Sequence, residues 1–329
     1  MVEEIRPFYP KKMKASIIIP TYNRSDLIIR SLETWTTQTL CSDDFEVIVI
    51  DNNSTDNSAE LIKSFIEDYP NFKYIKELKK GSTFARHAGA KLAQSDFLIF
   101  ADDDGLFNPT CIEEILKVYQ SNAEIAAVAG KIDILWDKTA PEWISPYEFI
   151  LGKLDYGDKV IMGTDLFLNG GLFSIKKSVF EKLGGFNPDL VGKYLVGDGD
   201  TGLVIKLHKD NRLIGWTPYA QMQHLQFVDK QGTVKDMGRR FYNVGISSSY
   251  GLFRENCFKV NMSVLKNILN SALHLLKKQV ELLIFAKDKR KTYFSMMQRK
   301  GELVFFWNLR RNAIRREIKT SLCITVKKH

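Results

Sequence analysis

Three consecutive carboxylates, Asp102, Asp103 and Asp104, follow a hydrophobic run at 96–101 that is typical of a buried strand. Adjacent carboxylates repel one another, so this arrangement costs stability unless a cation is present. Oxygen ligands of this kind favour Mg²⁺ or Mn²⁺, and such an ion often also binds phosphate oxygens. The sequence therefore predicts a divalent metal site that holds a diphosphate, with a solvated, helix-capping acidic turn as the alternative.

Polar segments also follow two other strand-like runs. Residues 20–24 end the run at 15–20, and Asp51 ends the run at 45–51. In open α/β sheets ligands bind at the carboxyl ends of the strands. Asp51 is therefore a candidate contact to a nucleobase or ribose, although a turn that only caps the next helix explains it equally well.

Three further positions suit chemistry at such a site. Arg86, near the start of a predicted helix, would favour an anion, or the segment simply packs on the sheet. The turn at 197–203 reads GDGDTGL, and an acid there suits a general base or a helix cap. His224 lies in an uncharged stretch, where it is either a core residue or an imidazole that completes a carboxylate metal site.

The elements that must position these residues alternate between strand and helix. Such an order predicts right-handed βαβ units and a mostly parallel central sheet flanked by helices, a Rossmann-like α/β fold. Beyond residue 126 we expect a strand at 126–135, a long loop at 136–165, a strand at 167–175, and helices at 176–183 and 201–209. The first part has predicted strands at 15–20, 45–51, 72–75 and 96–101, and helices at 25–37, 56–69, 82–94 and 108–120.

Composition limits the remaining possibilities. The 329 residues are 44% hydrophobic and carry a net charge of +8, which excludes a disordered or collagen-like chain. Four scattered cysteines without a CxxC pair argue against a zinc cluster and a disulfide framework. The dinucleotide GxGxxG, P-loop, HExxH and GxSxG motifs are all absent from the sequence.

Basic residues concentrate in the last quarter of the sequence. Residues 251–329 hold 18 Lys or Arg against five Asp or Glu, and 264–284 shows the apolar spacing of an amphipathic helix. The first residues lack a signal-peptide core, and no 18-residue window is apolar and free of charge, so we expect a cytoplasmic protein. The basic region predicts peripheral attachment to an anionic membrane, or a helical lid or oligomer contact; no recognised module supports nucleic-acid binding.

Five stretches in order resemble glycosyltransferase family 2, whose members have the GT-A fold. They are SIIIPTYNR (16–24), VIDNNSTDNS (49–58), STFARHAGAKLAQSDFLIFADDD (82–104), LNGGLFSIKKSVFEKLGGFN (168–187) and GDGDTGL (197–203). The resemblance implies inverting transfer of a sugar from a nucleotide diphosphate donor, by family habit a UDP-sugar, to a hydroxyl of a glycan or lipid-linked glycan, in surface polysaccharide or glycoconjugate synthesis. It also implies Mn²⁺ or Mg²⁺ as cofactor.

The resemblance assigns roles residue by residue. Asp200 matches the catalytic base; because Gly199 stands where the family usually has Glu, Asp198 competes for this role. Asp104, Asp102 and His224 match the metal site, with Asp104 the direct ligand, and Asn169, Gly170 and Gly171 match the sugar and acceptor region. The nucleotide-sugar contacts would be Pro20, Thr21, Tyr22, Asn23, Asp51, Asn53, Arg86, Asp102 and Asp103.

The predicted organisation has three parts. Residues 1–14 form an extension, 15–227 a GT-A catalytic domain, and 228–329 a helical, basic C-terminal region. The catalytic domain divides into a nucleotide-binding half, 15–105, and an acceptor half, 106–227. A non-catalytic binder of sugar nucleotides or glycans is one alternative function. The other is a sugar-phosphate nucleotidyltransferase, which is disfavoured because PTYNR replaces the Gly-rich loop such enzymes need after their first strand.

Overall fold

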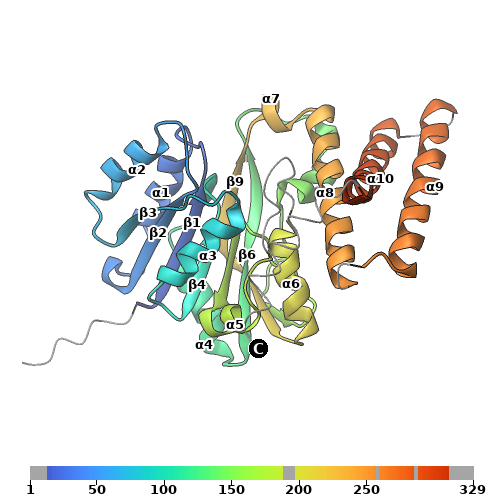
Figure 1. Ribbon diagram of the computed structural model, residues 1–329. Helices are drawn as coiled ribbons and strands as arrows, with labels where there is room; N and C mark the ends of the chain where they lie inside the picture. Colours follow the sequence, from blue (N-terminus) through green and yellow to red (C-terminus); the bar gives the residue numbers. More distant parts are fainter. Residues whose placement is uncertain (1–12, 188–196, 257–258, 285–287, 311–329) are drawn as a thin grey trace, which may run out of the picture.

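A mixed β-sheet runs through the chain from Ala15 to Gln226 (Figure 1). The computed structural model describes residues 13–187, 197–256, 259–284 and 288–310. The strands of this sheet pair in the order β3-β2-β1-β4-β8-β6-β9-β5, and β7 pairs with β9. Their bounds are β1 Ala15–Thr21, β2 Phe45–Asp51, β3 Phe72–Lys76, β4 Phe97–Ala101, β5 Gly105–Phe107, β6 Ile125–Trp136, β7 Ile161–Gly163, β8 Leu172–Lys176 and β9 Leu213–Gln226.

Helices cover both faces of this sheet. The hydrophobic cluster on one face includes residues of α1, α2 and α4, and the cluster on the other face includes residues of α3, α5 and α6. The bounds of the helices up to this point are α1 Ile28–Thr36, α2 Ser58–Ile66, α3 Ser82–Leu92, α4 Cys111–Ser121, α5 Lys177–Lys182 and α6 Gly199–Lys209, with 3₁₀ helices η1 Ser42–Asp44 and η2 Glu142–Leu151.

The predicted strands of the first half are buried on both sides. In β1, Ile17 and Ile19 join the cluster that contains Trp35, whereas Ile18 joins the cluster that contains Phe100. This alternation follows the two-residue period of a strand, so each β-branched residue fills one of the two hydrophobic layers. The close packing of both layers fixes the positions of the strand ends, where the polar candidate residues begin.

Strand direction changes across the sheet. β3, β2, β1 and β4 are parallel, as predicted, but β8 inserts antiparallel between β4 and β6. β9 is parallel to β6 and antiparallel to β5 and β7. The α/β sheet flanked by helices is therefore confirmed, with parallel pairing in its first half and mixed pairing in its second.

The second half contains more structure than its sequence predicts. The predicted loop at 136–165 holds η2 and β7, and β9 and β5 were not predicted as strands. The strand expected at 167–175 begins only at Leu172, because the amide of Leu172 closes a turn onto the carbonyl of Asn169. The helix expected at 201–209 is present as α6.

In the described part of the chain, four helices follow the sheet: α7 Val228–Gln231, α8 Val234–Glu255, α9 Met262–Ile284 and α10 Lys289–Arg310. The hydroxyl of Thr233 caps α8 by accepting from the amide of Asp236. In Figure 1, α10 lies between α8 and α9, and α9 is the outermost helix. Aromatic residues Tyr250, Phe253 and Phe305 form part of the core that joins α8 to α10.

The helical character predicted beyond residue 228 is confirmed for the described part, including the helix expected at 264–284. Among the residues described, no helix combines the length and apolar character needed to cross a bilayer. Residues 1–12 of the predicted extension and 311–329 of the basic region lie outside the described residues. The division into domains stays a prediction.

Candidate active site

The ends of β1, β2 and β4 meet at one cavity of about 630 Å³. This meeting is the expected consequence of parallel pairing, since neighbouring parallel strands end at the same edge. Residues of β9 and α8 close the cavity from the second half of the chain. Its lining includes Pro20, Thr21, Tyr22, Arg24, Asn52, Lys80, Gly81, Ser82, Arg86, Asp102, Asp103, Asp104, His224, Gln226, Gln231 and Arg240.

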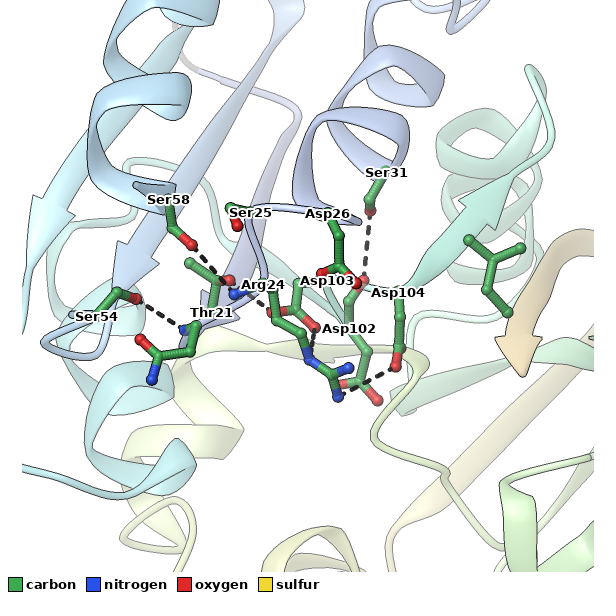
Figure 2. Close-up of polar contacts among 12 residues, drawn as sticks. Thr21, Arg24, Ser25, Asp26, Ser31, Ser54, Ser58, Asp102, Asp103 and Asp104 are labelled. Carbon is green, nitrogen blue, oxygen red and sulfur yellow. Dashed lines mark hydrogen bonds and ion pairs between the residues drawn. The ribbon is translucent and has the colours of Figure 1, made fainter. Parts of the chain in front are cut away.

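The loop after β1 contacts the acidic cluster directly. The hydroxyl of Thr21 donates to Asp103 Oδ2 at 2.6 Å. Arg24 Nε lies 3.8 Å from Asp103 Oδ1, and Arg24 Nη2 lies 3.6 Å from Asp104 Oδ2. Figure 2 shows the Arg24 side chain extended across these two carboxylates. Tyr22 is 45% exposed at this edge, and Lys80 Nζ lies over its ring, 5.9 Å from the centroid.

The three carboxylates differ in electrostatic state. Burial, reinforced by the charge of Asp104, raises the pKa of Asp103 to about 7. Burial also raises the pKa of Asp102, although Arg86 opposes it, with Nη2 2.7 Å from Asp102 Oδ1. Burial acts in the same direction on Asp104, but the hydrogen bond and charge of His224 and the charge of Arg24 outweigh it, so its pKa lies below the ordinary value. Asp104 is thus the carboxylate best able to stay ionised.

His224 faces Asp104 across the pairing of β5 with β9. Gly105 is the register partner of His224, and the amide of Leu225 donates to the carbonyl of Asp104 at 3.0 Å. This backbone pairing places His224 Nε2 at 3.1 Å from Asp104 Oδ1. Burial lowers the pKa of His224, but the hydrogen bond and charge of Asp104 outweigh it and raise the pKa above its ordinary value.

Asp104 and His224 fit a divalent cation. Two neighbouring ligands of an octahedral ion with bonds of about 2.1 Å are ~3.0 Å apart, close to the observed separation of the two atoms. A carboxylate oxygen with an imidazole nitrogen suits Mn²⁺. Among the described residues, no three His, Cys, Asp or Glu side chains are grouped as a metal site, so phosphate oxygens and water would complete the coordination. Asp102 is engaged by Arg86.

The turn after β2 is organised around Asp51, which is fully buried. Its Oδ1 accepts from the amide of Ser54 at 2.8 Å, and its Oδ2 accepts from the hydroxyl of Tyr74 at 2.8 Å. Asn53 has a positive φ of 66° in this turn. Asn23, in the loop after β1, accepts from the amide of Thr55, so the two loops are tied together. The cavity lining draws on Asn52 from this turn.

Asp200 reaches the same region through Gly170. The amide of Gly170 donates to Asp200 Oδ2 at 2.6 Å, and its carbonyl accepts from Arg86 Nη2 at 3.1 Å. A Cβ on Gly170 would lie 3.0 Å from Arg86 Nη2 and 3.3 Å from Asp200 Oδ2, so any larger residue here would press on both side chains. The neighbouring Asn169 accepts from the amide of Gly171. One residue, Gly170, therefore links the carboxylate of Asp200 to the arginine that holds Asp102.

The side chain of Asp198, the competing candidate base, is already bound by other side chains. Its two oxygens accept from the side-chain amide of Asn187 at 2.9 and 3.0 Å. Arg254 Nη2, from the end of α8, lies 2.9 Å from Asp198 Oδ2. With its side chain only 3% exposed and its charge paired, Asp198 supports the turn that carries Asp200.

Comparison with known proteins decides the family. The family described as "Glycosyl transferase family 2" matches residues 16–184, slightly more than half of the chain. The chain belongs to glycosyl transferase family 2. This membership confirms the resemblance carried by the five sequence stretches.

Curated relatives of this family 2 chain cover a smaller part of it. Validoxylamine A glucosyltransferase from Streptomyces hygroscopicus subsp. jinggangensis is 37% identical over 117 residues, 35% of this chain and 28% of that protein. The poly(ribitol-phosphate) β-N-acetylglucosaminyltransferase TarP of Staphylococcus aureus is 32% identical over 112 residues, 33% of this chain and 34% of TarP. The chain thus spans about a third of the length of these relatives.

Solved structures with the same fold extend over more of the chain. The mannosyltransferase PcManGT from Pyrobaculum calidifontis, in complex with GDP-Man and Mn²⁺, has a TM-score of 0.57 at 16% identity and covers 91% of this chain and 89% of its own. GalNAc-T7 with UDP, GalNAc and Mn²⁺ has a TM-score of 0.53 at 17% identity and covers 73% of this chain and 49% of its own. These likenesses show the GT-A fold.

Several cavity residues of the family 2 chain were not predicted as site residues. Arg24 lies in the quoted stretch 16–24 without an assigned role, and Lys80 precedes the stretch at 82–104. Arg240 comes from α8, one residue after another arginine, and only the folding of α8 against the sheet brings it to the cavity. A search for cations near the predicted carboxylates would have found Arg24; no local signal identifies Arg240.

Proposed function

We propose that this chain is a metal-dependent, inverting glycosyltransferase that moves a sugar from a nucleoside diphosphate sugar, with UDP as the favoured nucleotide, to an acceptor hydroxyl. One observation carries the proposal: a single chain of contacts joins Asp200, Gly170, Arg86 and Asp102 beside the Asp104–His224 pair. Direct contacts therefore connect a candidate base to the cavity that holds the candidate cation site.

The donor nucleotide would lie along the ends of β1 and β2. Pro20, Thr21 and Tyr22 line this part of the cavity, and its volume is in the range of ordinary ligand pockets. Asn23, Asp51 and Asn53 would shape the base-binding loops that their hydrogen bonds and backbone conformations organise. Asp102 and Asp103 would face the ribose and phosphates.

Cations supply the complementary charge for a diphosphate. Arg24, Lys80, Arg86 and Arg240 all line the cavity. Arg240 Nε is buried without a hydrogen-bond partner among the described residues, so a phosphate oxygen would satisfy it. This concentration of donors favours an anionic ligand over a neutral sugar alone.

Asp104 and His224 would hold Mn²⁺ or Mg²⁺, and Asp102, which lines the same cavity, would join through the ligand or a water. The ion, when bound, supplies Lewis-acid stabilisation of the leaving diphosphate. Arg86 would keep Asp102 ionised and positioned, since their ion pair opposes the effect of burial on the Asp102 carboxyl. The β5–β9 pairing would hold the two metal-binding side chains in place before the donor arrives.

Asp200 is proposed as the general base that takes the proton of the acceptor hydroxyl. Its Oδ2 is oriented by a single backbone amide, whereas Asp198 is already paired with Asn187 and Arg254. Attack by the activated hydroxyl on the face of the anomeric carbon opposite the diphosphate inverts that centre. Asn169, Gly170 and Gly171 would form the wall next to the transferred sugar.

The acceptor is proposed to be a glycan or lipid-linked glycan of a surface polysaccharide or glycoconjugate, reached at the inner face of the cytoplasmic membrane. Support comes from a stripe of exposed apolar side chains along α9, each between 47% and 67% exposed. Successive members of the stripe are three or four residues apart, so they lie on one side of α9. The stripe consists of Met262, Leu265, Leu269, Leu273, Leu276 and Val280.

The deciding experiment measures donor binding and turnover separately. Thermal unfolding is followed with UDP, GDP and dTDP, each with and without Mn²⁺, because a ligand that binds only the folded state raises the melting temperature. Release of nucleotide is then measured from UDP-glucose, UDP-N-acetylglucosamine and GDP-mannose. A Mn²⁺-dependent shift with one nucleotide, and release from the matching sugar donor, is expected.

Other outcomes assign the alternatives. Mn²⁺-dependent binding without any donor hydrolysis or transfer would make the chain a non-catalytic sugar-nucleotide binder. Formation of pyrophosphate from a nucleoside triphosphate and a sugar phosphate would make it a nucleotidyltransferase. No shift with any of the three nucleotides in folded protein would overturn the donor site.

A further inference from the structure

A second cavity, of about 620 Å³, lies between η2, α8 and α10. It is about as large as the donor cavity but differs in chemistry, because five of its eleven described lining residues are aromatic. Phe241 of α8 and Phe294 of α10 stack with centroids 5.1 Å apart and planes inclined by 6°. Both rings are nearly buried, so they form the floor of the cleft.

The rings of η2 stand over this floor. Tyr147 meets both Phe241 and Phe294 edge-on, with centroids 6.0 and 5.0 Å away. Phe149 is 61% exposed, so its ring is open to solvent at the cleft. Trp143 completes the wall on the side of Phe294. The accessible faces of these rings are flat and rigid.

Charged side chains sit at the edge of the aromatic wall. The guanidinium of Arg290 lies 5.2 Å from the centroid of Trp143. Burial raises the pKa of Tyr147, and the charge of Asp288 adds to this effect, which places that carboxylate near the phenol. Asp288 and Arg290 line the cleft together with three other polar side chains. The cleft thus offers hydrogen-bond donors and acceptors next to apolar planes.

This combination matches a sugar ring. A pyranose presents C–H groups on its faces and hydroxyls around its edge, so it stacks on an aromatic plane while its edge bonds to carboxylate and guanidinium groups. None of the described lining side chains is Leu, Ile, Val or Met, the residues expected for a lipid chain. The wall therefore favours a saccharide over an acyl chain.

The cleft is structurally coupled to the donor cavity. Adjacent residues of α8 serve the two sites, since Arg240 lines the donor cavity and Phe241 lines the cleft. The helix η2 ends at Leu151 and is followed by the C-cap residue Gly152, which has a φ of +102°. A Cβ on Gly152 would lie 3.2 Å from His224 Nδ1, so the end of the aromatic segment contacts the candidate metal ligand.

We propose that this aromatic cleft is a saccharide subsite that binds a sugar of the acceptor glycan away from the ring that receives the new bond. That this saccharide belongs to the acceptor rests on the proposed function. That the cleft binds a saccharide does not. A subsite here would let the protein hold a chain of several sugars while its terminal hydroxyl lies at the donor cavity.

Saccharide binding is tested without donor, metal or turnover. Maltotriose, cellotriose and chitotriose serve as probes in saturation-transfer-difference NMR with the full chain. At least one trisaccharide should show saturation transfer, which Phe149→Ala and Trp143→Ala each reduce at least fivefold. Phe149→Trp, which keeps an aromatic face, should retain the signal.

Tyr219→Ala provides the matched control, because Tyr219 is an aromatic residue that is 52% exposed and lines neither cavity. It should leave saturation transfer unchanged. If none of the three trisaccharides gives a signal that depends on Trp143 and Phe149, the subsite is overturned. Circular dichroism of each variant identifies misfolding, and Phe149→Ser, at an exposed position, replaces any variant that fails to fold.

The nucleotide-induced melting shift, measured on the same variants, separates the two proposals. A preserved shift with lost saccharide binding would leave the donor site intact and locate the saccharide in the cleft. Saccharide binding that persists in a chain with no nucleotide shift would contradict the proposed transfer reaction while leaving the subsite in place.

Discussion

Asp104 and His224 come from distant parts of the chain, yet Asp104 Oδ1 and His224 Nε2 lie 3.1 Å apart. The three-residue strand β5 accounts for this proximity, because its first residue, Gly105, is in register with His224. Without β5, the acidic turn after β4 would have no fixed relation to β9. A very short strand thus sets the geometry of the candidate cation site.

Replacing either member of this pair should abolish the metal dependence of donor binding. Asp104→Asn and His224→Gln keep similar size but remove the charge or the imidazole, so the added effect of Mn²⁺ on nucleotide-induced melting should disappear. At a ligand concentration 100 times the dissociation constant, the stabilisation at stake is about 2.7 kcal/mol. Chelation with EDTA should have the same effect on the unaltered chain. If both variants keep the full effect of Mn²⁺ on nucleotide-induced melting, the cation does not bind at Asp104 and His224.

Asp200→Asn should bind nucleotide normally and lose turnover by a factor on the order of 10²–10⁴, the usual cost of a missing general base. The asparagine can still accept from the amide of Gly170, so the local structure should persist. Steady-state transfer rates and melting shifts measured on the same preparation separate the two effects. Full activity in this variant, together with an inactive Asp198→Asn variant, would assign the role of base to Asp198.

Arg254→Met should destabilise the fold by about 3–5 kcal/mol, the usual cost of leaving a buried charge without its partner. The Arg254 and Asp198 side chains are 16% and 3% exposed, so solvent screens their ion pair only weakly. Urea unfolding measures the change. Adding Asp198→Asn to the same chain should recover part of the loss, because the unpaired charge is then absent. Additive losses in the double variant would show that the two residues do not interact.

Stability should fall with alkaline pH through Tyr74. Burial and then the hydrogen bond and charge of Asp51 raise the pKa of Tyr74 from 10.0 to about 12. The folded state therefore keeps the phenol proton that the unfolded state loses above pH 10, and this contribution is complete below pH 10 and lost as pH rises through about 12. The difference in unfolding free energy between the unaltered chain and Tyr74→Phe should shrink between pH 9 and pH 11. A constant difference would contradict the raised pKa.

The apolar stripe of α9 predicts binding to anionic vesicles. The chain should float with vesicles containing phosphatidylglycerol, and the double variant Leu269→Glu and Leu276→Glu should not, since two carboxylates would face the acyl boundary. Leu92→Glu is the matched control, because Leu92 is 46% exposed at the end of α3, outside the stripe. Equal flotation of all three proteins would exclude the stripe as the membrane contact.

The strand ends that carry Asp51 and Asp102 could be predicted from sequence because their signals are local. Each follows a run of β-branched or aromatic residues, and the two-faced burial of such a run follows from its composition. The first half of the sheet and its polar edge could therefore be predicted without the structure. The same holds for Arg86, whose place near the start of α3 follows from the helix itself.

β9 shows why the second half of the sheet was harder to predict from the sequence. Positions 214–218 of its 14 residues are buried in succession and include Pro218, whereas 219–223 alternate between exposed and buried, so the pattern changes along the strand. Its pairings with β6, β5 and β7 are long-range, and they determine that it is a strand. The role of His224 depends on one of those pairings.

The sequence does not distinguish Asp198 from Asp200 as the candidate base, because the contact that separates them is also long-range. Both acids lie in one Gly-rich turn, and nothing within that turn distinguishes them. The difference arises from Arg254, whose side chain reaches Asp198 only because α8 lies beside the turn. Ion pairs between distant segments leave no periodic pattern in the chain.

The helix α8 has a consequence for how the protein can be divided into fragments. It contributes Arg240 to the donor cavity, Phe241 to the aromatic cleft and Arg254 to the turn of Asp200. A fragment that stops at residue 227 would retain the whole sheet but leave Asp198 without its partner and the donor cavity open on one side. The smallest unit that can be expected to work by itself must therefore reach beyond Glu255, although the family match ends at residue 184.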